Sequence, residues 1–194
     1  MKRLILVLMA AILLALPAAA QVQTWQLDPS HSAAQFAVKH LGLSTVRGAF
    51  TKLSGTLQYD AADPTKSVVE VTIETPSVDT RVEMRDNDIR GEKLLDVKNY
   101  PTMTFKSRRV ESAGAGKLKV IGDLTLHGVT KEVALEVDGP SQAIHDPWGN
   151  LRMGASGTTS INRREFGVGT GYPAMVIGDD IGITIDAEII RPAK

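Results

Sequence analysis

The sequence predicts an all-β protein made of antiparallel strands. In most segments apolar and polar residues alternate, which puts the apolar set on one face because strand side chains point to opposite faces with a period of two. Short turn signals rich in Gly, Pro, Asp and Asn separate these segments. Segment 122–137 also reads as two strands joined by a tight turn, so consecutive strands are expected to run in opposite directions.

The hairpin at 122–137 limits the length of its own turn. Its apolar side chains fall at even positions before a His127-Gly128 pair and at odd positions after it: Leu124, Leu126, Val133, Leu135 and Val137. Directly opposed residues of an antiparallel hairpin have a constant sum of residue numbers, and only an odd sum brings the two sets together. A two-residue turn at His127-Gly128 gives an odd sum, and so does a four-residue turn ending at Thr130. Either turn produces a one-sided antiparallel sheet.

The other expected strands follow the same alternation along the chain, at 35–40, 53–59, 69–74, 103–105, 118–120 and 181–189. Turn signals lie between them at 60–64, 113–116, 138–140 and 146–150. Many short strands broken by turns predict a sandwich or a barrel rather than parallel β-α-β units. We expect about eight strands, the number at which a closed barrel can hold one small ligand. Periodicity alone does not separate a barrel from a sandwich.

One segment, 81–97, departs from the strand pattern. It is charged, and its apolar residues are spaced for one or two short helices interrupted at Gly91. Pro101 ends this region, because the residue before a proline is pushed out of helical geometry. We expect the insertion to cover one end of the β-structure.

The N-terminus predicts export. Lys2 and Arg3 precede an apolar run from Leu4 to Leu16 and a small-residue end at 17–20, which is the pattern of a cleaved signal peptide. The expected domains are therefore a signal peptide at 1–20 and one β-domain at 21–194, without a membrane anchor. There is no cysteine, so burial of apolar surface must stabilise the fold. The formal net charge is +0, which gives no sign of a nucleic-acid-binding surface.

Few residues suggest catalysis, and none forms a metal or cofactor motif. Asp86, Asp88 and Gly91 partly match a calcium loop, but Arg90 and Val97 stand at ligand positions. The four histidines, His31, His40, His127 and His145, lack metal-ligand spacing. His31 lies between two serines and is read as a local hydrogen-bonding corner. His40 lies on the apolar face of its strand, where it would be either a satisfied core residue or a ligand contact.

The inward face is the more informative site. The side chains predicted to line it are Phe36, Val38, His40, Phe50, Ile73, Phe105, Val120, Leu124, Ile161, Ile183 and Ile185. Small residues fall in phase with them at Gly122, Ala155, Gly157 and Ala187. Such residues either leave room for an aliphatic or isoprenoid ligand or merely fit the taper of a filled barrel. Arg163 and Arg164 are either a cationic contact for a polar head group or a solvated charge pair.

Several motifs together resemble the YceI-like family of exported polyisoprenoid-binding proteins. They are W-Q-L-D-P-S-H-S-A-A-Q-F-A-V-K-H-L-G from Trp25, V-R-G-A-F from Val46, N-Y-P-T-M-T-F from Asn99, G-D-L-T-L-H-G-V-T-K from Gly122 and I-N-R-R-E-F-G-V from Ile161. The resemblance implies an eight-stranded antiparallel lipocalin-like barrel with a short helical insertion, a pocket for an isoprenoid or similar lipid, and a periplasmic location. Asn87 and Leu94-Leu95 depart from the family pattern.

Three functions follow as hypotheses. The leading one is a periplasmic carrier or store for a polyprenyl chain, a quinone, a fatty acid or a fatty amide, with no cofactor and no covalent step. The second is an enzyme that acts on such a lipid through His40 or His31 and a carboxylate in the pocket. The third is a structural or partner-binding module with a filled barrel. Edge strands and the insertion each offer a surface for a homodimer, and the sequence does not choose between a dimer and a monomer.

Overall fold

The computed structural model describes residues 22–192. The elements are β1 (Gln23–Leu27), β2 (Ala33–His40), β3 (Ser44–Phe50), β4 (Leu53–Tyr59), η1 (Pro64–Lys66), β5 (Val68–Glu74), η2 (Thr75–Ser77), β6 (Val78–Asp79), α1 (Glu83–Arg90), β7 (Thr102–Gly114), β8 (Lys117–Leu126), β9 (Val129–Asp138), β10 (Ile144–His145), β11 (Asn150–Asn162), η3 (Arg163–Phe166) and β12 (Ile177–Pro192). The signal peptide predicted at 1–20 lies outside the described residues.

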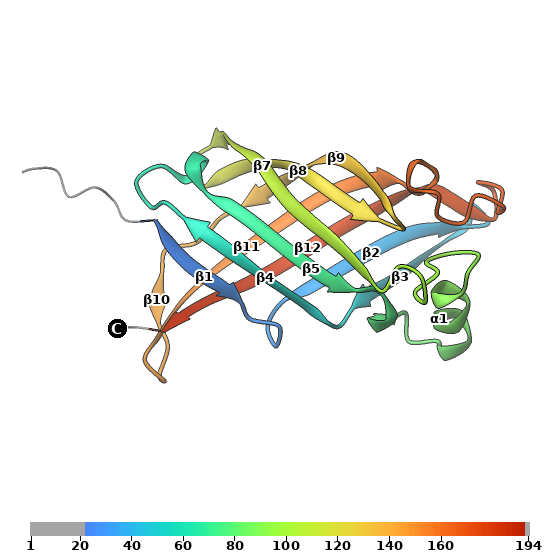
Figure 1. Cartoon of the computed structure of the whole chain (residues 1–194), viewed down its shortest axis with the longest axis horizontal. Coiled ribbons are helices and arrows are strands. Elements are labelled where there is room, and N and C mark those ends of the chain that lie inside the picture. Colours follow the sequence, from blue (N-terminus) through green and yellow to red (C-terminus); the bar gives the residue numbers. More distant parts are fainter. Residues whose placement is uncertain (1–21, 193–194) are drawn as a thin grey trace, which may run out of the picture.

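Eight strands close into a barrel, as the resemblance implied (Figure 1). The ring runs β11-β9-β8-β7-β5-β4-β1-β12 and returns to β11, with every pairing antiparallel. β12 is long enough to carry two strands in series on its other edge. Its residues from Ile177 to Asp186 pair with β2, and Ile189 and Ile190 pair with β1.

The hairpin β8–β9 has the two-residue turn. Leu126 pairs with Val129, and both turn residues, His127 and Gly128, have positive φ, as a type I′ turn requires. Leu124 then pairs with Lys131, which is exposed near the end of the strand. The inward apolar run of β9 therefore begins at Val133.

Several strands are absent from the sequence prediction or longer than it expects. β3 and β11 carry small and polar residues in place of alternating large apolar ones, and β1 is short. β7 extends to Gly114, far beyond the 103–105 segment, because its second half lies on β8 after a bulge between Ser107 and Arg109. The insertion forms one helix, α1, capped at Gly91. The chain after it continues as turns rather than as a second helix.

The position of Gly122 differs from the prediction that it is a small residue of the inward face. It was expected to leave room inside the barrel, but it lies opposite Ser107 at the β7 bulge. A Cβ at this position would clash with the Lys106 carbonyl oxygen. The glycine is therefore required by a close approach of two backbones, and it leaves no space for a ligand.

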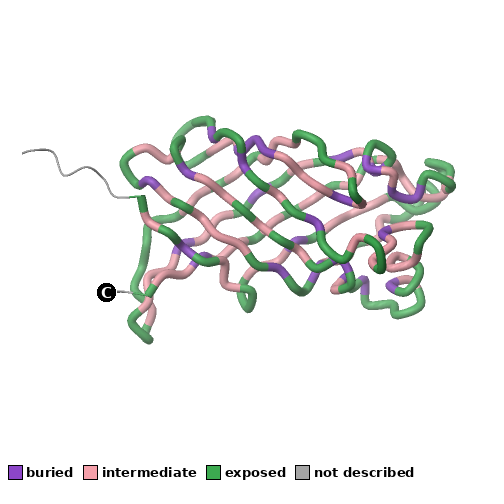
Figure 2. Tube along the Cα trace, in the orientation of Figure 1, coloured by how far each residue is buried: buried purple, intermediate pink, exposed green. Residues whose placement is uncertain are grey.

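Two packed clusters stabilise the ends of the barrel. One lies near α1 and contains Phe50, Val78, Leu95, Met103, Leu126, Ile161, Phe166 and Val168. The other contains Trp25, Met153 and Ile189, from β1, β11 and β12. In Figure 2 most of the wall between the ends is neither fully buried nor fully exposed.

Gly122→Ala tests the backbone contact. We expect it to lower the free energy of unfolding by about 1–3 kcal/mol, because the added methyl group has to displace backbone. Urea unfolding measures the change. Gly182→Ala on β12 is the matched control, since its nearest neighbour would be the Ala37 carbonyl oxygen at 3.9 Å. Equal stability of the two variants would contradict the assignment.

Candidate functional site

An apolar cavity of about 700 Å³ runs inside the barrel. Its wall includes residues of β2 and β3 and of all the ring strands. The structure places every predicted lining residue in this wall: Phe36, Val38, His40, Phe50, Ile73, Phe105, Val120, Leu124, Ile161, Ile183 and Ile185. Ala155, Gly157 and Ala187 also belong to the wall. The volume lies within the range of small-molecule binding sites.

The burial pattern shows that the interior is hollow. Phe36, Ile73 and Ile183 point inward, yet they are only half-buried. Side chains in a filled core lose nearly all their accessible surface, because interiors pack as densely as organic crystals. The inward side chains of this barrel therefore face empty space, and the filled-barrel hypothesis is wrong.

The cavity has one closed end. Trp25, Met153 and Ile189 occupy inward positions of neighbouring strands there and are 2%, 4% and 6% exposed. We call Trp25, Met153 and Ile189 the plug. The Arg191 guanidinium lies 5.0 Å from the centre of the Trp25 ring, so a cation–π contact covers the plug. This end of the barrel carries the hairpin of β10 and β11 (Figure 1).

The mouth lies at the opposite end. Lys39, His40, Val82, Met84 and Asp88 line the cavity and are exposed. They belong to the end of β2 and to α1 with the residue before it, which lie at the same end of the barrel in Figure 1. His40 is thus a residue of the mouth rather than a buried core histidine. The insertion lies at one end of the barrel, as predicted, but it borders the opening there and does not cover it.

Arg163 does not have a free guanidinium for a head group. It is 2% exposed, and its five N–H donors are all taken by the backbone carbonyls of Gly178, Val168, Gly169, Tyr172 and Ile177. Nη2 also lies 2.8 Å from Asp179. Burial lowers the pKa of Arg163, but Asp179 opposes that shift. The Arg163 side chain therefore holds the loop between η3 and β12 in place through these carbonyls.

Arg164, which is partly exposed, also contacts this loop. Nε pairs with Asp179 at 2.6 Å, and its other nitrogens donate to the carbonyls of Thr170 and Tyr172. The two arginines therefore clamp one loop from both faces. Neither the head-group contact nor the solvated pair describes them.

Sequence reasoning missed the polar groups that do stand at the mouth. Arg85 lines the cavity and is held by Thr80, whose Oγ1 accepts from Nε at 2.8 Å and whose carbonyl accepts from Nη2 at 2.9 Å. Within residues 22–192, Nη1 of Arg85 donates to no protein atom. Asp88 lies one helical turn later, in the same wall. Their i,i+3 spacing on a predicted helix was the signal that could have found them.

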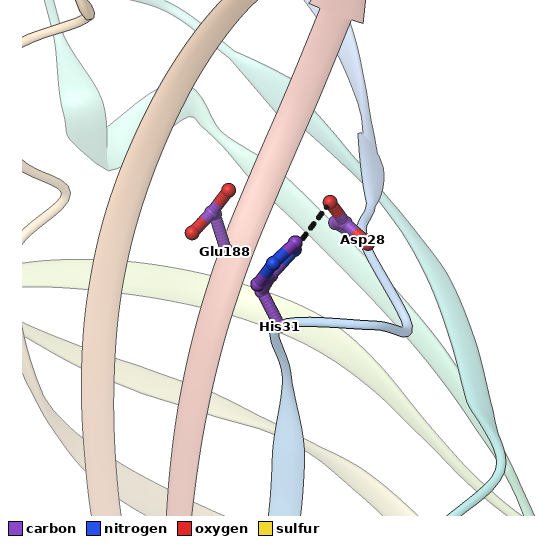
Figure 3. Close-up of side chains that lie close together, drawn as sticks. All are labelled: Asp28, His31 and Glu188. Atoms are coloured by element: carbon purple, nitrogen blue, oxygen red, sulfur yellow. Dashed lines mark hydrogen bonds and ion pairs between the residues drawn. The ribbon is translucent and has the colours of Figure 1, made fainter. Parts of the chain in front are cut away.

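The other polar cluster lies at the closed end. His31 Nδ1 contacts Asp28 Oδ2 at 3.0 Å, and Glu188 lies close to both (Figure 3). Arg152 contacts Asp28 at 2.6 Å and Asp146 at 2.7 Å, and it also contacts Glu188. The guanidinium thus stands where a metal ion would have to bind these carboxylates. We call Arg152, Asp28, Asp146 and Glu188 the ion-pair network.

The network shifts the acidity of its members. Hydrogen bonds from His31 and Arg152 lower the pKa of Asp28 from 3.8 to about 2. Burial alone would raise the pKa of Asp146, but hydrogen bonds from Arg152, Asn150 and the Trp148 amide hold it below its ordinary value. Hydrogen bonds to Asp146, Asp28 and Glu188 raise the pKa of Arg152.

The fold and the cavity define the class of protein: a closed antiparallel eight-stranded barrel with a hollow apolar interior. The family model described as the YceI-like domain matches residues 25–189. The chain belongs to this family, which confirms the resemblance seen in its motifs. A UPF0312 protein of Shewanella sp. (strain W3-18-1) is 40% identical over 170 residues, covering 87% of this chain and 88% of the relative.

Solved structures agree on the fold. The crystal structure of Burkholderia cenocepacia BcnA matches with a TM-score of 0.73 and 26% identity, over 84% of this chain and 98% of that one. A structure described as a polyisoprenoid binding domain from Saccharophagus degradans matches with a TM-score of 0.65 over 89% of this chain and 100% of that one. At 18% identity the second likeness concerns the fold alone. No helix within residues 22–192 is long and apolar enough to cross a membrane.

Asp28→Asn tests the ion-pair network. At pH 7 we expect it to lower the free energy of unfolding by about 1–2 kcal/mol. The folded-state pKa of Asp28 is depressed, so its contribution is complete above about pH 4 and disappears as the pH falls toward about 2. Urea unfolding over this pH range measures the difference. Asp180→Asn, at an exposed residue without an ion pair among the described residues, is the control. A pH-independent difference would contradict the expectation.

Arg163→Lys tests the loop clamp. Lysine keeps the charge but has three donors, so at least two buried carbonyls lose their partner. We expect the free energy of unfolding to fall by at least about 2 kcal/mol. Arg164→Lys, at a side chain that is 37% exposed, should change it by less than about 1 kcal/mol. If Arg163→Lys left stability intact and weakened ligand binding, the head-group interpretation would return.

Proposed function

We propose that this protein binds a long apolar chain, such as an isoprenoid, a quinone or a fatty acid or amide, inside the barrel and carries or stores it. The observation that carries the proposal is the hollow apolar cavity with one closed and one open end. An elongated apolar ligand suits this shape better than a compact polar one. No covalent step is required.

Burial of the chain supplies the driving force. Each methylene group moved from water into an apolar environment contributes about 0.8 kcal/mol. The inward isoleucine, valine and leucine side chains offer only dispersion contacts, so the wall recognises length and shape more than chemical detail. This tolerance fits a carrier for a class of lipids.

The polar end of the ligand belongs at the mouth. Polar groups stand in the wall at that end, namely Lys39, His40, Arg85 and Asp88. Nη1 of Arg85 donates to no other described residue, so its N–H groups are available to a head group. The plug at the other end offers no comparable group, because the ion-pair network lies among residues outside the cavity wall. The chain therefore enters first and the head group stays near water.

Two further considerations support this proposal. The same fold is used by a domain described as polyisoprenoid-binding, a fold-level analogy only. The N-terminal pattern at 1–20 is that of an export signal, so we propose the bacterial periplasm as the location. An exported carrier would shield its lipid from water between membranes.

The enzyme alternative needs a titratable pair inside the cavity. Among the described residues, the histidine that contacts a carboxylate is His31, and neither His31 nor Asp28 lines the cavity. His40 and Asp88 both line the mouth, but no hydrogen bond joins them. Incubation with a prenyl ester or fatty amide and mass spectrometry of the products is the direct test of turnover.

A homologous series of saturated fatty acids tests the binding mode. We expect the Kd to fall about fourfold for each added methylene, from 0.8 kcal/mol per group, until the cavity is full. Isothermal titration below the critical micelle concentration measures the series. A Kd independent of chain length would refute the cavity as the binding site, as would the absence of binding together with no lipid co-purifying from the native host.

A cavity-filling variant locates the ligand. Ala187→Phe adds a ring to the wall near the closed end, so the gain in affinity should stop at a shorter chain. Thr184→Phe lies on the same strand but is exposed, and should leave the series unchanged. Identical plateaus in the two variants would place the ligand elsewhere.

A further inference from the structure

Five exposed apolar side chains surround the open end of the cavity. They are Leu41, Leu43, Val82, Met84 and Met175, with exposed fractions of 45%, 84%, 44%, 76% and 72%. They come from three separate segments: the β2–β3 turn, the start of α1 with the residue before it, and the loop that precedes β12. We call this set the apolar rim.

One hydrogen bond joins two of these segments, and the third shares the cavity wall with them. The Leu41 amide donates to the Val176 carbonyl at 3.2 Å, which fixes the β2–β3 turn against the loop before β12. Val82, Met84 and Val176 themselves belong to the cavity wall. Figure 1 places the three segments at the same end of the barrel, and Figure 2 shows exposed loops at that end beside buried stretches. The apolar surface of the rim is therefore continuous with the apolar wall of the cavity.

We propose that the apolar rim docks this protein on a bilayer of zwitterionic phospholipids, with the mouth facing the membrane. The inference rests on the proposed function, because docking gives a lipid a path from the bilayer into the cavity that avoids water. Exposing such side chains permanently to water is unfavourable. Inserting them into the interfacial region of a bilayer removes that cost during docking.

The shape of the rim favours a fluid partner. Its side chains project from separate segments. Two of the three most exposed, Leu43 and Met175, lie in loops. Separate side chains arranged around the cavity mouth do not form the closely packed, complementary core that a protein interface needs. Lipid tails adapt to such side chains, and flexible methionine side chains adapt in turn.

The charges near the rim match a zwitterionic head group. Lys39 lies near the end of β2, Arg81 just before α1, and Glu83, Arg85 and Asp88 within α1. None of these five makes an ion pair with another described residue. Cations can meet phosphates while the carboxylates meet ammonium groups. The net charge of the set is small, so docking is expected to depend on apolar insertion more than on anionic lipid.

The test is co-sedimentation with phosphatidylcholine vesicles. The variant Leu43→Asp/Met175→Asp changes two rim residues that lie outside the cavity wall, and we expect at least a tenfold loss of vesicle binding. Leu43→Ser/Met175→Ser is a milder second variant with the same expected direction. Ile144→Asp, at a residue 64% exposed on β10, is the control and should bind as the wild type does.

Several outcomes overturn the proposal. These are wild-type protein that stays in the supernatant, rim variants that bind as tightly as the wild type, and binding that requires anionic lipid or disappears as salt rises from about 0.05 M to about 0.5 M. A wild-type dimer in sedimentation velocity that both rim variants dissolve would instead make the rim an interface between two copies.

A solution titration separates this proposal from the proposed function. The rim variants should bind a soluble medium-chain fatty acid with the wild-type Kd. If the wild type binds the soluble fatty acid but does not bind the vesicles, the docking proposal alone is refuted. Loss of solution binding in both the wild type and the variants would sink the cavity proposal, and with it the purpose of docking.

Discussion

The pairing of β11 with β12 is the constraint on which the rest of the barrel depends. The register runs without a shift from the pair Asn150–Pro192 to the pair Asn162–Asp180. This pairing closes the barrel, because the remaining ring strands connect β11 to β12 around the other side. A slip of one residue would turn the inward isoleucines of β12 to the outside. The other edge of β12 then aligns β1 and β2 in series, which sets both the plug and the mouth.

A closed ring with one apolar face does not by itself give a cavity. The wall is hollow because small residues occupy inward positions of β11 and β12 at Ala155, Gly157 and Ala187, where facing strands would otherwise fill the centre. Stability must then come from elsewhere. It comes from the packed clusters at the two ends, and the unfilled space between them is available for a ligand.

The sequence predicted the parts of this arrangement that depend on alternation. Period and register predicted the inward set of β12 and an even-length turn at His127, and the structure selects the two-residue turn over the four-residue one. The closed barrel was implied by the family motifs, because alternation alone fits a sandwich as well. The expected strands did not include β11, although Ala155, Gly157 and Ile161 were placed on the inward face, because alternation of small with polar residues carries little hydrophobic signal. Nor did it reveal what surrounds Gly122 and Arg163, since a bulge on β7 and carbonyls converging from a loop are contacts between distant segments.

At the closed end of the barrel, one rule of strand geometry links the outer charges to the inner apolar residues. Arg152 and Glu188 belong to the ion-pair network, and their sequence neighbours Met153 and Ile189 belong to the plug. Adjacent strand residues point to opposite faces, so the charges that pin the strands on the outside also hold the apolar plug on the inside. Asp28 ties the chain after β1 to the same network. The mouth end has its own packed cluster near α1, but the exposed side chains around the opening take no part in the ion-pair network and can contact a ligand or a membrane.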